Sequence, residues 1–330
     1  MQAILLSAPG VPENLYLGET PTPVPGPREV RVCVAATALN RADTLQRQGK
    51  YPPPPGASDI LGLEMAGVVE SLGPDCKHAQ VGQRVCGLLS GGGYAEYVVI
   101  HEDMLLPVPD TLSLTDAAGI PEVFLTAYQA LVLIANLRAG EQILIHAGAS
   151  GVGTAATQLA RRIGATVWVT ASAGKHHICQ QMGARHIIDY RAEDFSERVK
   201  EGTEGKGVNV ILDFLAAAYF QQNLNSLALD GRMVMLSLMG GIKVPELNLV
   251  NMLRRRLQVT GSTLRSRTLD YKIELTRRFR EDAWADFATG TLRPVIDRIL
   301  PLGEVAVGHT AMEANENAGK IILQVNADLD

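Results

Sequence analysis

Cysteine is scarce in this sequence of 330 residues. Four are present, Cys33, Cys76, Cys86 and Cys179, and no two are spaced as a Cys-x-x-Cys pair. Four distant cysteines do not form a disulfide framework for a chain of this length, and they exclude a structural zinc site built from clustered cysteines. We therefore expect reduced thiols and a cytoplasmic protein.

An excess of positive charge is also lacking. Lysine and arginine number 30 against 35 aspartate and glutamate, which gives a formal net charge of −5. Proteins that bind nucleic acid do so largely by neutralising phosphates with basic side chains. A weakly acidic chain without a large basic block therefore argues against a nucleic-acid partner.

Long hydrophobic runs are missing as well. The most apolar stretch, Val123–Leu137, is interrupted by Gln129 and Asn136 and is bounded by Glu122 and Arg138. A membrane span needs about 18 or more consecutive apolar residues. We read this stretch as a buried or half-buried helix, and we expect neither a membrane partner nor a secretory signal, because the first residues carry no basic region.

The pattern of turns and periodicity divides the chain into three stretches. Residues 1–120 contain short β-patterned runs separated by proline and glycine turns, which predicts a β-rich domain of the barrel type. These runs are Ala3–Leu6, Val30–Ala36, Met65–Leu72, Arg84–Leu88 and Ala95–Ile100. Residues 263–330 carry a charged helical pattern (Leu269–Thr289) and closing strands, and are too few for a domain. We expect them to complete the first domain.

Residues 121–262 alternate between strand and helix patterns. Expected strands are Gln142–Ala147, Thr166–Thr170, His186–Asp189, Val208–Asp213 and Arg232–Ser237, and expected helices include Val152–Ile163 and Lys175–Met182. Such alternation is typical of βαβ units around a parallel sheet. The predicted fold class is α/β, with a doubly wound Rossmann sheet beside the β-rich domain.

A glycine-rich turn follows the first of these strands. It reads Gly148-Ala149-Ser150-Gly151-Val152-Gly153 and leads into the helix. Glycines at this place let backbone N–H groups approach a pyrophosphate at the helix N-terminus. Ser150 occupies the second glycine position of the usual G-x-G-x-x-G pattern, and its hydroxyl would add a donor. The strand before and helix after this turn favour dinucleotide binding over a turn without a ligand.

The end of the second strand indicates which dinucleotide binds. NAD sites usually carry an Asp or Glu about 20 residues beyond the glycines, to accept from the ribose 2′-hydroxyl. Here the strand is followed by Ala171-Ser172-Ala173-Gly174-Lys175, with no acidic residue. Ser172 and Lys175 are suited to a 2′-phosphate, so we expect NADPH; the alternative for Lys175 is a solvated side chain.

Several motifs together resemble those of the zinc-free quinone oxidoreductases of the medium-chain dehydrogenase/reductase superfamily. They are Asn40-Arg41-Ala42-Asp43, Gly62-Leu63-Glu64-Met65-Ala66-Gly67, the Ala147–Gly153 turn and Gly319-Lys320. The resemblance covers essentially the whole chain. It implies a chaperonin-10-like catalytic domain, a Rossmann domain, an active site in the cleft between them, and a homodimer.

The resemblance also bears on metal binding. Zinc-dependent members of the superfamily hold catalytic zinc with an early Cys, the His of a Gly-His-Glu motif and a later Cys or acid. In this sequence Asn40 lies near the expected Cys and Leu63 replaces the His. We therefore expect no metal. Without a Lewis acid, quinones are suitable acceptors, because their reduction restores an aromatic ring and forms a stabilised phenolate.

Candidate substrate residues lie in the first stretch. Tyr51 follows an expected helix and precedes Pro52–Pro55, a stiff run suited to a pocket wall; its hydroxyl could bond a quinone oxygen, or it could simply pack against the prolines. Asn40 could orient substrate or the nicotinamide amide, or it could cap the following helix. Thr126 is placed near the nicotinamide by the resemblance, or bonds back to its own helix.

Further cofactor residues are expected at strand ends and in the returning segment. They are Tyr190 near the adenosine, Leu238, Met239, Gly240 and Gly241 after a late strand, Thr263, Leu264 and Arg265 on the nicotinamide side, and Lys320. Ligands of open α/β sheets bind at the carboxyl ends of the strands. For Lys320 the alternatives are a phosphate contact and a solvated lysine.

These observations lead to NADPH-dependent reduction of ortho- and para-quinones without a metal. One alternative is reduction of α,β-unsaturated carbonyls with the same cofactor, for which Tyr51 could donate the proton. Another is a low-turnover NADPH-binding sensor or structural protein. The expected partner is therefore a small-molecule quinone substrate.

Overall fold

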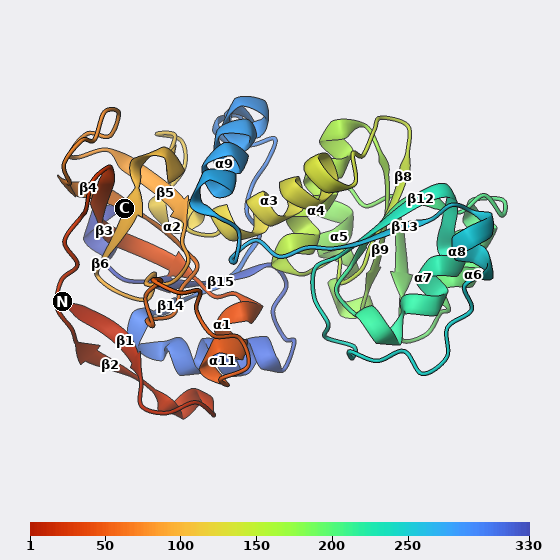
Figure 1. The fold of residues 1–330 in the computed structure, drawn as a ribbon, viewed down its shortest axis with the longest axis horizontal. Coiled ribbons are helices and arrows are strands. Elements are labelled where there is room, and N and C mark those ends of the chain that lie inside the picture. Colours follow the sequence, from red (N-terminus) through yellow and green to blue (C-terminus); the bar gives the residue numbers. More distant parts are fainter. The chain divides into compact units, whose positions relative to one another are not determined.

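The computed structural model describes residues 1–330 and divides the chain into two units (Figure 1). Unit 1 comprises Met1–Leu125 together with Leu264–Asp330, and unit 2 comprises Thr126–Thr263. Unit 1 is therefore assembled from two parts of the chain that are distant in sequence. None of the helices in residues 1–330 has both the length and the apolar character that crossing a membrane requires.

Unit 1 is built on antiparallel strands. A sheet of seven strands has the order β14-β15-β3-β4-β5-β7, with β6 pairing to β3, and β1 and β2 form a separate pair. The bounds are β1 (Gln2–Leu6), β2 (Leu15–Glu19), β3 (Glu29–Ala38), β4 (Glu64–Leu72), β5 (Arg84–Leu88), β6 (Tyr97–His101), β7 (Leu105–Pro107), β14 (Ile296–Pro301) and β15 (Lys320–Gln324). Only β14 and β15 run parallel.

The closing strand β15 pairs with the end of β3, with Ile322 opposite Ala38. Ile321 and Leu323 of β15 are fully buried in a core that also contains Ile4, Leu61 and Tyr94. Alternate residues of a strand point to opposite faces. Because β15 runs beside β3, its first residue, Lys320, lies where β3 gives way to the helix that follows it.

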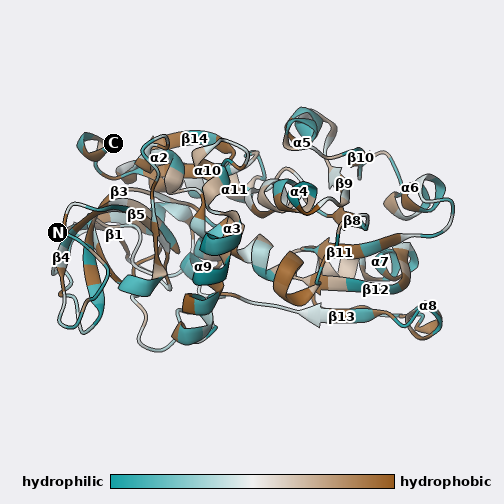
Figure 2. Cartoon of the chain, turned by 90° about the horizontal axis from the view of Figure 1, so that it is seen from above, coloured by the Kyte–Doolittle hydropathy of each residue, from teal (hydrophilic) through white to brown (hydrophobic).

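Helices of unit 1 cover this sheet. They are α1 (Arg41–Arg47), α2 (Leu114–Ala117), α3 (Pro121–Tyr128, which continues into unit 2), α9 (Leu269–Ala283), α10 (Ala285–Ala288) and α11 (Val305–Glu313). The Thr268 hydroxyl accepts from the Tyr271 amide and caps α9. Hydrophilic residues colour much of α9 in Figure 2. The single helix predicted over Leu269–Thr289 is interrupted at Trp284, whose indole donates to the Pro107 carbonyl.

Unit 2 is a six-stranded parallel sheet of order β10-β9-β8-β11-β12-β13. Its strands are β8 (Gln142–Ile145), β9 (Thr166–Ala171), β10 (His186–Asp189), β11 (Val208–Asp213), β12 (Leu227–Met235) and β13 (Gln258–Gly261). Its helices are α4 (Gly151–Ile163), α5 (His176–Met182), α6 (Phe195–Gly202), α7 (Phe220–Ser226) and α8 (Val250–Arg254). Figure 2 shows β13 beyond β12, at the border of the sheet.

Both faces of this sheet are covered. Phe195 of α6 and Leu224 of α7 pack with Leu144 and Ile211 of the central strands. The neighbouring residues of β8, Ile143 and Ile145, are equally buried and point to the other face, where α4 contacts β8 and β9. This arrangement confirms the predicted doubly wound architecture, and its strand order changes direction between β8 and β11.

Some elements differ from the prediction. β8 ends at Ile145, because Ala147 adopts the left-handed region with φ of 49° and cannot extend the strand. β12 begins at Leu227 rather than Arg232. The apolar stretch Val123–Leu137 is helical as far as Ile134, and after α3 the helix widens into a π-helical turn at Gln129–Ile134; Asn136, with φ of 49°, lies beyond its end.

Candidate functional site

The glycine turn between β8 and α4 has the geometry of a phosphate cradle. A side-chain carbon on Gly148 would lie 2.5 Å from Val169 Cβ, and one on Gly153 would lie 2.4 Å from the Ala147 carbonyl oxygen. Both distances are too short for any larger residue. The two glycines therefore allow α4 to pack closely on the sheet, as the third glycine of dinucleotide-binding turns does.

Hydrogen-bond donors converge at the start of α4. The amides of Gly151 and Val152 have no acceptor within the chain, as expected for the first turn of a helix. The Ser150 oxygen accepts from the Gly153 amide at 3.1 Å, which leaves its hydroxyl hydrogen available. A helix N-terminus with free amides attracts phosphate through hydrogen bonds and the helix dipole. The residues of this turn therefore fit the pyrophosphate of a dinucleotide.

Most predicted cofactor residues follow strands at the same, carboxyl edge of the parallel sheet. Ser172 and Lys175 come directly after β9, Tyr190 after β10, Leu238–Gly241 after β12 and Thr263 after β13. Ser172 and Lys175 are half-buried, and Tyr190 is exposed beneath the Arg191 guanidinium, 5.7 Å from the ring centre. Parallel strands bring these sequence-distant positions to one edge.

The segment after β12 is held by the segment after β11. The amides of Met239 and Gly240 donate to the carbonyls of Phe214 and Leu215 at 3.1 and 2.9 Å. The side chains of Leu238 and Met239 are exposed. This leaves apolar surface and glycine backbone near the edge where a cofactor would bind, with Gly241 also exposed.

His146 supports the turn and was missed by the sequence reasoning. It lies between β8 and Gly148, is fully buried, and contacts Thr170 Oγ1 through Nδ1 at 3.0 Å and Asn223 Oδ1 through Nε2 at 2.7 Å. Burial lowers its pKa, so the ring is held neutral. His146 thus ties the glycine turn to β9 and to α7.

In unit 1, Tyr51 lies beneath a buried cation. The Arg265 guanidinium carbon is 5.5 Å from the centre of the Tyr51 ring. Arg265 donates to the Ser90 carbonyl at 2.9 Å and to Gln46 Oε1 at 2.7 Å, while its Nη1 has no partner. Burial raises the pKa of the half-buried Tyr51 hydroxyl, so this hydroxyl is a neutral donor at physiological pH.

Lys320 does not have either of the two roles considered from the sequence. It is buried, and its ammonium donates to the Leu39 carbonyl at 2.8 Å, to Asn40 Oδ1 at 2.7 Å and to Glu64 Oε1 at 2.8 Å. A lysine has three N–H donors, and all three are used here. It is therefore neither a phosphate ligand nor a solvated side chain.

Asn40 is occupied by the same network. Its side-chain amide donates to Glu64 Oε1 at 2.8 Å and its oxygen accepts from Lys320, while its backbone N–H donates to Asp43 Oδ2 at 2.8 Å at the start of α1. Asn40 is the N-cap residue of α1, the alternative that the sequence also offered. Its side chain joins the charges of Glu64 and Lys320.

The network around Asn40 also bears on whether this site could bind zinc. At the positions that correspond to the motif His and the early Cys of zinc-dependent relatives, Leu63 is buried and apolar and Asn40 binds an ammonium. Across residues 1–330, no group of three or more His, Cys, Asp or Glu side chains is placed to hold a metal ion. The donor set at Asn40 and Leu63 therefore does not fit a catalytic zinc.

A second buried acid lies in the first turn of α1. Asp43 accepts from the Tyr94 hydroxyl at 3.0 Å and from the Gly62 amide at 3.2 Å, and Tyr94 also contacts His309 Nε2 at 3.4 Å. Burial raises the pKa of the Asp43 carboxyl to about 6, although the hydrogen bonds that it accepts lower it. This cluster holds α1 and α11 together.

Glu122, in the first turn of α3, is the acidic residue that the sequence reasoning missed. Its backbone N–H donates to Glu64 Oε2 at 2.8 Å, whereas its carboxyl makes no hydrogen bond or ion pair. The signal available in the sequence was an acid directly after Pro121 in an otherwise apolar segment. Thr126 lies one turn later in the same helix and is half-buried, and Leu264 is buried in unit 1.

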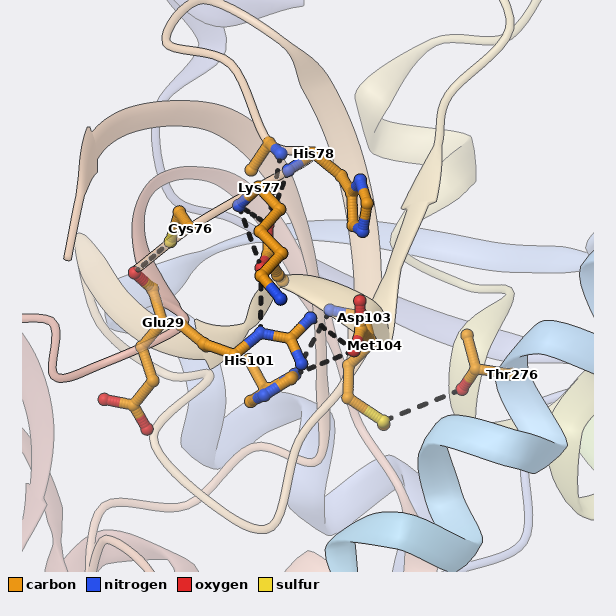
Figure 3. A network of polar contacts seen from close by, with 11 residues as sticks. Glu29, Cys76, Lys77, His78, His101, Asp103, Met104 and Thr276 are labelled. Atoms are coloured by element: carbon orange, nitrogen blue, oxygen red, sulfur yellow. Dashed lines mark hydrogen bonds and ion pairs between the residues drawn. The ribbon is translucent and has the colours of Figure 1, made fainter. Parts of the chain in front are cut away.

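A further polar network in unit 1 is structural (Figure 3). The Glu102 carboxylate accepts from the backbone amides of Lys77 and His78, each at 2.8 Å, and pairs with Arg28 at 3.1 Å. Burial alone would raise the pKa of Glu102, but these donors outweigh it and lower the pKa to about 2. The carboxylate thus clamps the turn between β4 and β5.

Two family descriptions match the chain. Residues 26–110 match the alcohol dehydrogenase GroES-like domain, and residues 151–280 match the zinc-binding dehydrogenase family. The first match lies in unit 1 and the second begins with α4 and extends into α9. The predicted combination of a Rossmann sheet with a GroES-like, β-rich domain is thereby confirmed.

Curated relatives cover almost all of the chain. The quinone oxidoreductase of Lama guanicoe is 32% identical over 327 residues, which is 98% of this chain and 97% of the relative. The synaptic vesicle membrane protein VAT-1 homolog of Rattus norvegicus is 31% identical over 339 residues, which is 98% of this chain and 84% of the relative.

Solved structures extend the similarity to three dimensions. Mycobacterial Rv1454c complexed with NADPH has a TM-score of 0.88 at 28% identity and covers 98% of this chain and 100% of its own. The CurK enoyl reductase has a TM-score of 0.87 at 29% identity and covers 98% of both chains. The chain therefore belongs to the medium-chain dehydrogenase/reductase superfamily.

Proposed function

We propose that this protein is an NADPH:quinone oxidoreductase that works without a metal. The observation that carries the proposal is the ammonium of Lys320, which binds Glu64 and also Asn40, the residue near the position where zinc-dependent relatives would have a Cys ligand. A substrate that accepts a hydride without a Lewis acid suits such a site, and quinones have this property. The similarity to a quinone oxidoreductase over nearly the whole chain supports the same reading.

The cofactor is NADPH, which when bound supplies the hydride. The free amides of Gly151 and Val152 and the Ser150 hydroxyl would bind its pyrophosphate. Ser172 and Lys175, with no acid between them, would bind the 2′-phosphate. Tyr190, with its exposed ring, would lie at the adenosine end, and the exposed Leu238–Gly241 segment would contact the cofactor from β12.

The substrate groups belong to unit 1. The neutral Tyr51 hydroxyl would donate to a quinone oxygen, and the unpartnered Nη1 of Arg265 would stabilise negative charge that develops there. Arg265 is held by Ser90 and Gln46, so its guanidinium is already oriented before substrate arrives. Thr126, Thr263 and Leu264 are proposed to line the nicotinamide side.

The experiment that tests this function is NADPH oxidation by the purified protein with 1,4-benzoquinone and 9,10-phenanthrenequinone. We expect turnover with NADPH, weaker turnover with NADH, and no loss after treatment with a chelator. NADPH binding without turnover of any quinone would reject the proposal and favour a sensor role.

Reduction of α,β-unsaturated carbonyls is the second candidate. Its support is the structural similarity to the CurK enoyl reductase and the presence of a neutral hydroxyl, Tyr51, able to donate a proton to the enolate carbon. Both reactions would use the same cofactor and the same groups. Turnover of an enone such as crotonyl thioester would establish it.

We further propose a cytoplasmic homodimer. β13 is the border strand of the parallel sheet, and the nearby segment presents exposed apolar side chains. These are Leu238, Met239, Ile242, Leu249 and Leu253. An unpaired strand beside apolar surface is normally covered, and a second copy of the chain provides a symmetric cover. Light scattering of the purified protein would give the mass of a dimer, and the mass of one chain would reject it.

A further inference from the structure

Ala147, which lies between β8 and the glycine turn, has a strained backbone. Its φ of 49° falls in the left-handed region, which alanine enters at a cost because its Cβ crowds the following carbonyl oxygen. A residue other than glycine keeps such a conformation only where the surrounding structure imposes it. Ala147 must therefore be held from outside.

Both neighbours of Ala147 bind the same residue of β9. Before it, the imidazole of His146 contacts Thr170 Oγ1 through Nδ1 at 3.0 Å. After it, the backbone N–H of Gly148 donates to the Thr170 carbonyl at 2.9 Å. His146 and Thr170 are 0% and 1% exposed, so water does not compete for these bonds. Thr170 thus holds the chain on both sides of the strained residue.

The direction of the His146 bonds follows from its second partner. Asn223 Oδ1, 2.7 Å from Nε2, can only accept, so Nε2 carries the proton of the neutral ring. Nδ1 then accepts from the Thr170 hydroxyl. The ring also meets Phe195 edge-on, with 4.8 Å between the ring centres. Two hydrogen bonds and an aromatic contact therefore fix the orientation of the imidazole.

The conformation of Ala147 determines the shape of the phosphate turn. Its carbonyl accepts from the Ser150 amide at 2.9 Å, and a side-chain carbon on Gly153 would lie 2.4 Å from the same oxygen. This carbonyl therefore both closes the turn and lies against the first turn of α4. A change of Ala147 to an unstrained conformation would redirect the chain after it and break the bond from Ser150.

Resting on the proposed cofactor site, we infer that His146 is a positioning residue for NADPH: through Thr170 it holds Ala147 in the strained conformation that shapes the pyrophosphate-binding turn. Because its side chain is fully buried, His146 acts through the turn rather than on the cofactor itself. A turn that adopts its binding conformation for only a fraction of the time loses affinity by that fraction. Loss of the bond between His146 and Thr170 therefore weakens binding of NADPH and NADH alike, because both contain the pyrophosphate.

The test first removes the Thr170 hydroxyl and then removes the strain. Thr170→Val is nearly isosteric and leaves His146 Nδ1 without its donor. We expect the dissociation constants for NADPH and NADH, measured by fluorescence titration, to rise by the same factor of about ten. Thr170→Ser, which keeps the hydroxyl, should bind both as the wild type does. Adding Ala147→Gly to Thr170→Val should restore most of the affinity, since glycine takes the left-handed conformation without strain.

Two further variants complete the comparison. His146→Phe keeps a ring in the cluster but removes both hydrogen bonds, and it should show the same loss and the same rescue by Ala147→Gly. Thr203→Val is the matched control. It also removes a buried hydroxyl from unit 2, one that donates to the Val199 carbonyl at 2.7 Å and accepts from the Gly207 amide at 2.8 Å. We expect it to lower the thermal unfolding temperature and to leave both dissociation constants unchanged.

Three results would overturn the role of His146. They are unchanged affinity in Thr170→Val and His146→Phe, a loss that Ala147→Gly does not restore, and a loss for NADPH alone, which would place the effect at the 2′-phosphate. Wild-type protein that binds neither dinucleotide rejects the proposed cofactor site and this inference with it. The expected pattern of dissociation constants supports the inference even where no quinone is turned over, a result that rejects only the quinone activity.

Discussion

Glu64 and Lys320 form an ion pair inside unit 1, with 2.8 Å between Oε1 and Nζ and with side chains that are 0% and 3% exposed. The pair joins the first strand residue of β4 to that of β15. Glu64 also accepts from the Asn40 side chain and from the Glu122 backbone, so one carboxylate fixes α1, α3 and β15 together. Tyr51, one of the proposed substrate groups, follows α1 in the chain.

Removing Lys320 should therefore be costly. Lys320→Met leaves the buried Glu64 carboxylate without its counter-ion, and we expect the free energy of unfolding to fall by about 3–5 kcal/mol. Urea unfolding followed by circular dichroism measures this. Adding Glu64→Gln to Lys320→Met should recover part of the loss. A loss of less than about 1 kcal/mol, as for an exposed pair, would contradict the assignment.

Gly148→Ala should destabilise unit 2 and weaken NADPH binding. The new methyl carbon would lie 2.5 Å from Val169 Cβ, and overpacking of this kind costs about 1–3 kcal/mol. Gly174→Ala is the matched control, because no atom lies within 4 Å of its added carbon. Thermal unfolding and NADPH fluorescence titration of both variants test this; equal behaviour of the two would refute the close packing.

Ser172→Asp should change the choice of cofactor. A carboxylate at the end of β9 would repel a 2′-phosphate and accept from a ribose 2′-hydroxyl. We expect the dissociation constant for NADPH to rise at least about tenfold, which corresponds to about 1.4 kcal/mol. The dissociation constant for NADH, which serves as the internal control, should stay the same or fall. Equal weakening of both cofactors would show that Ser172 is not at the 2′-phosphate.

Glu102 should contribute to stability in a pH-dependent way. Its pKa is lowered from 4.5 to about 2 in the folded chain, so the unfolded chain binds more protons in that window. The stabilisation is complete above the unfolded pKa and is lost as the pH falls from 4.5 to about 2. Urea unfolding at several pH values should show wild type more stable than Glu102→Gln at pH 6, with the difference shrinking towards pH 2; a difference independent of pH would contradict the clamp shown in Figure 3.

Tyr51→Phe should separate the two candidate reactions. A neutral hydrogen bond contributes about 1 kcal/mol, so quinone turnover should fall by no more than about tenfold. Enone reduction needs the hydroxyl as a proton donor and should fall about 100-fold or more. Parallel assays with a quinone and an enone on the same preparation decide the point, and equal losses in both would contradict a proton-donor role of Tyr51 confined to enone reduction.

Local patterns predicted much of the fold. The strand, glycine turn and helix around Gly148–Gly153 are encoded by adjacent residues, and the bounds of β5, β10 and β11 agree with their periodic patterns. β13, with its sequence Gln-Val-Thr-Gly, was missed because a short border strand has little apolar alternation. The end of β8 before Ala147 was missed because the left-handed conformation of Ala147 follows from the turn around it rather than from the preference of alanine.

The buried charges could not be predicted from the sequence in the same way. Lys320 meets Asn40 and Glu64 only after β15 pairs with β3, and no local pattern records that pairing. The raised pKa of the Glu122 carboxyl comes first from its burial and then from the charges of Glu64 and Asp43, which belong to other elements. The proline-rich surroundings of Tyr51 made it a candidate from the sequence. Its contact with Arg265 could not be predicted, because it forms only when residues 264–330 fold back onto the first part of unit 1.

The most direct test of the whole account is NADPH oxidation with ortho- and para-quinones by chelator-treated protein, followed together with superoxide formation. We predict turnover that needs NADPH, is insensitive to chelation and yields hydroquinone by hydride transfer with little superoxide. Activity that disappears with chelation and returns with zinc would contradict the account, because the Asn40, Glu64 and Lys320 network has no place for a metal ion.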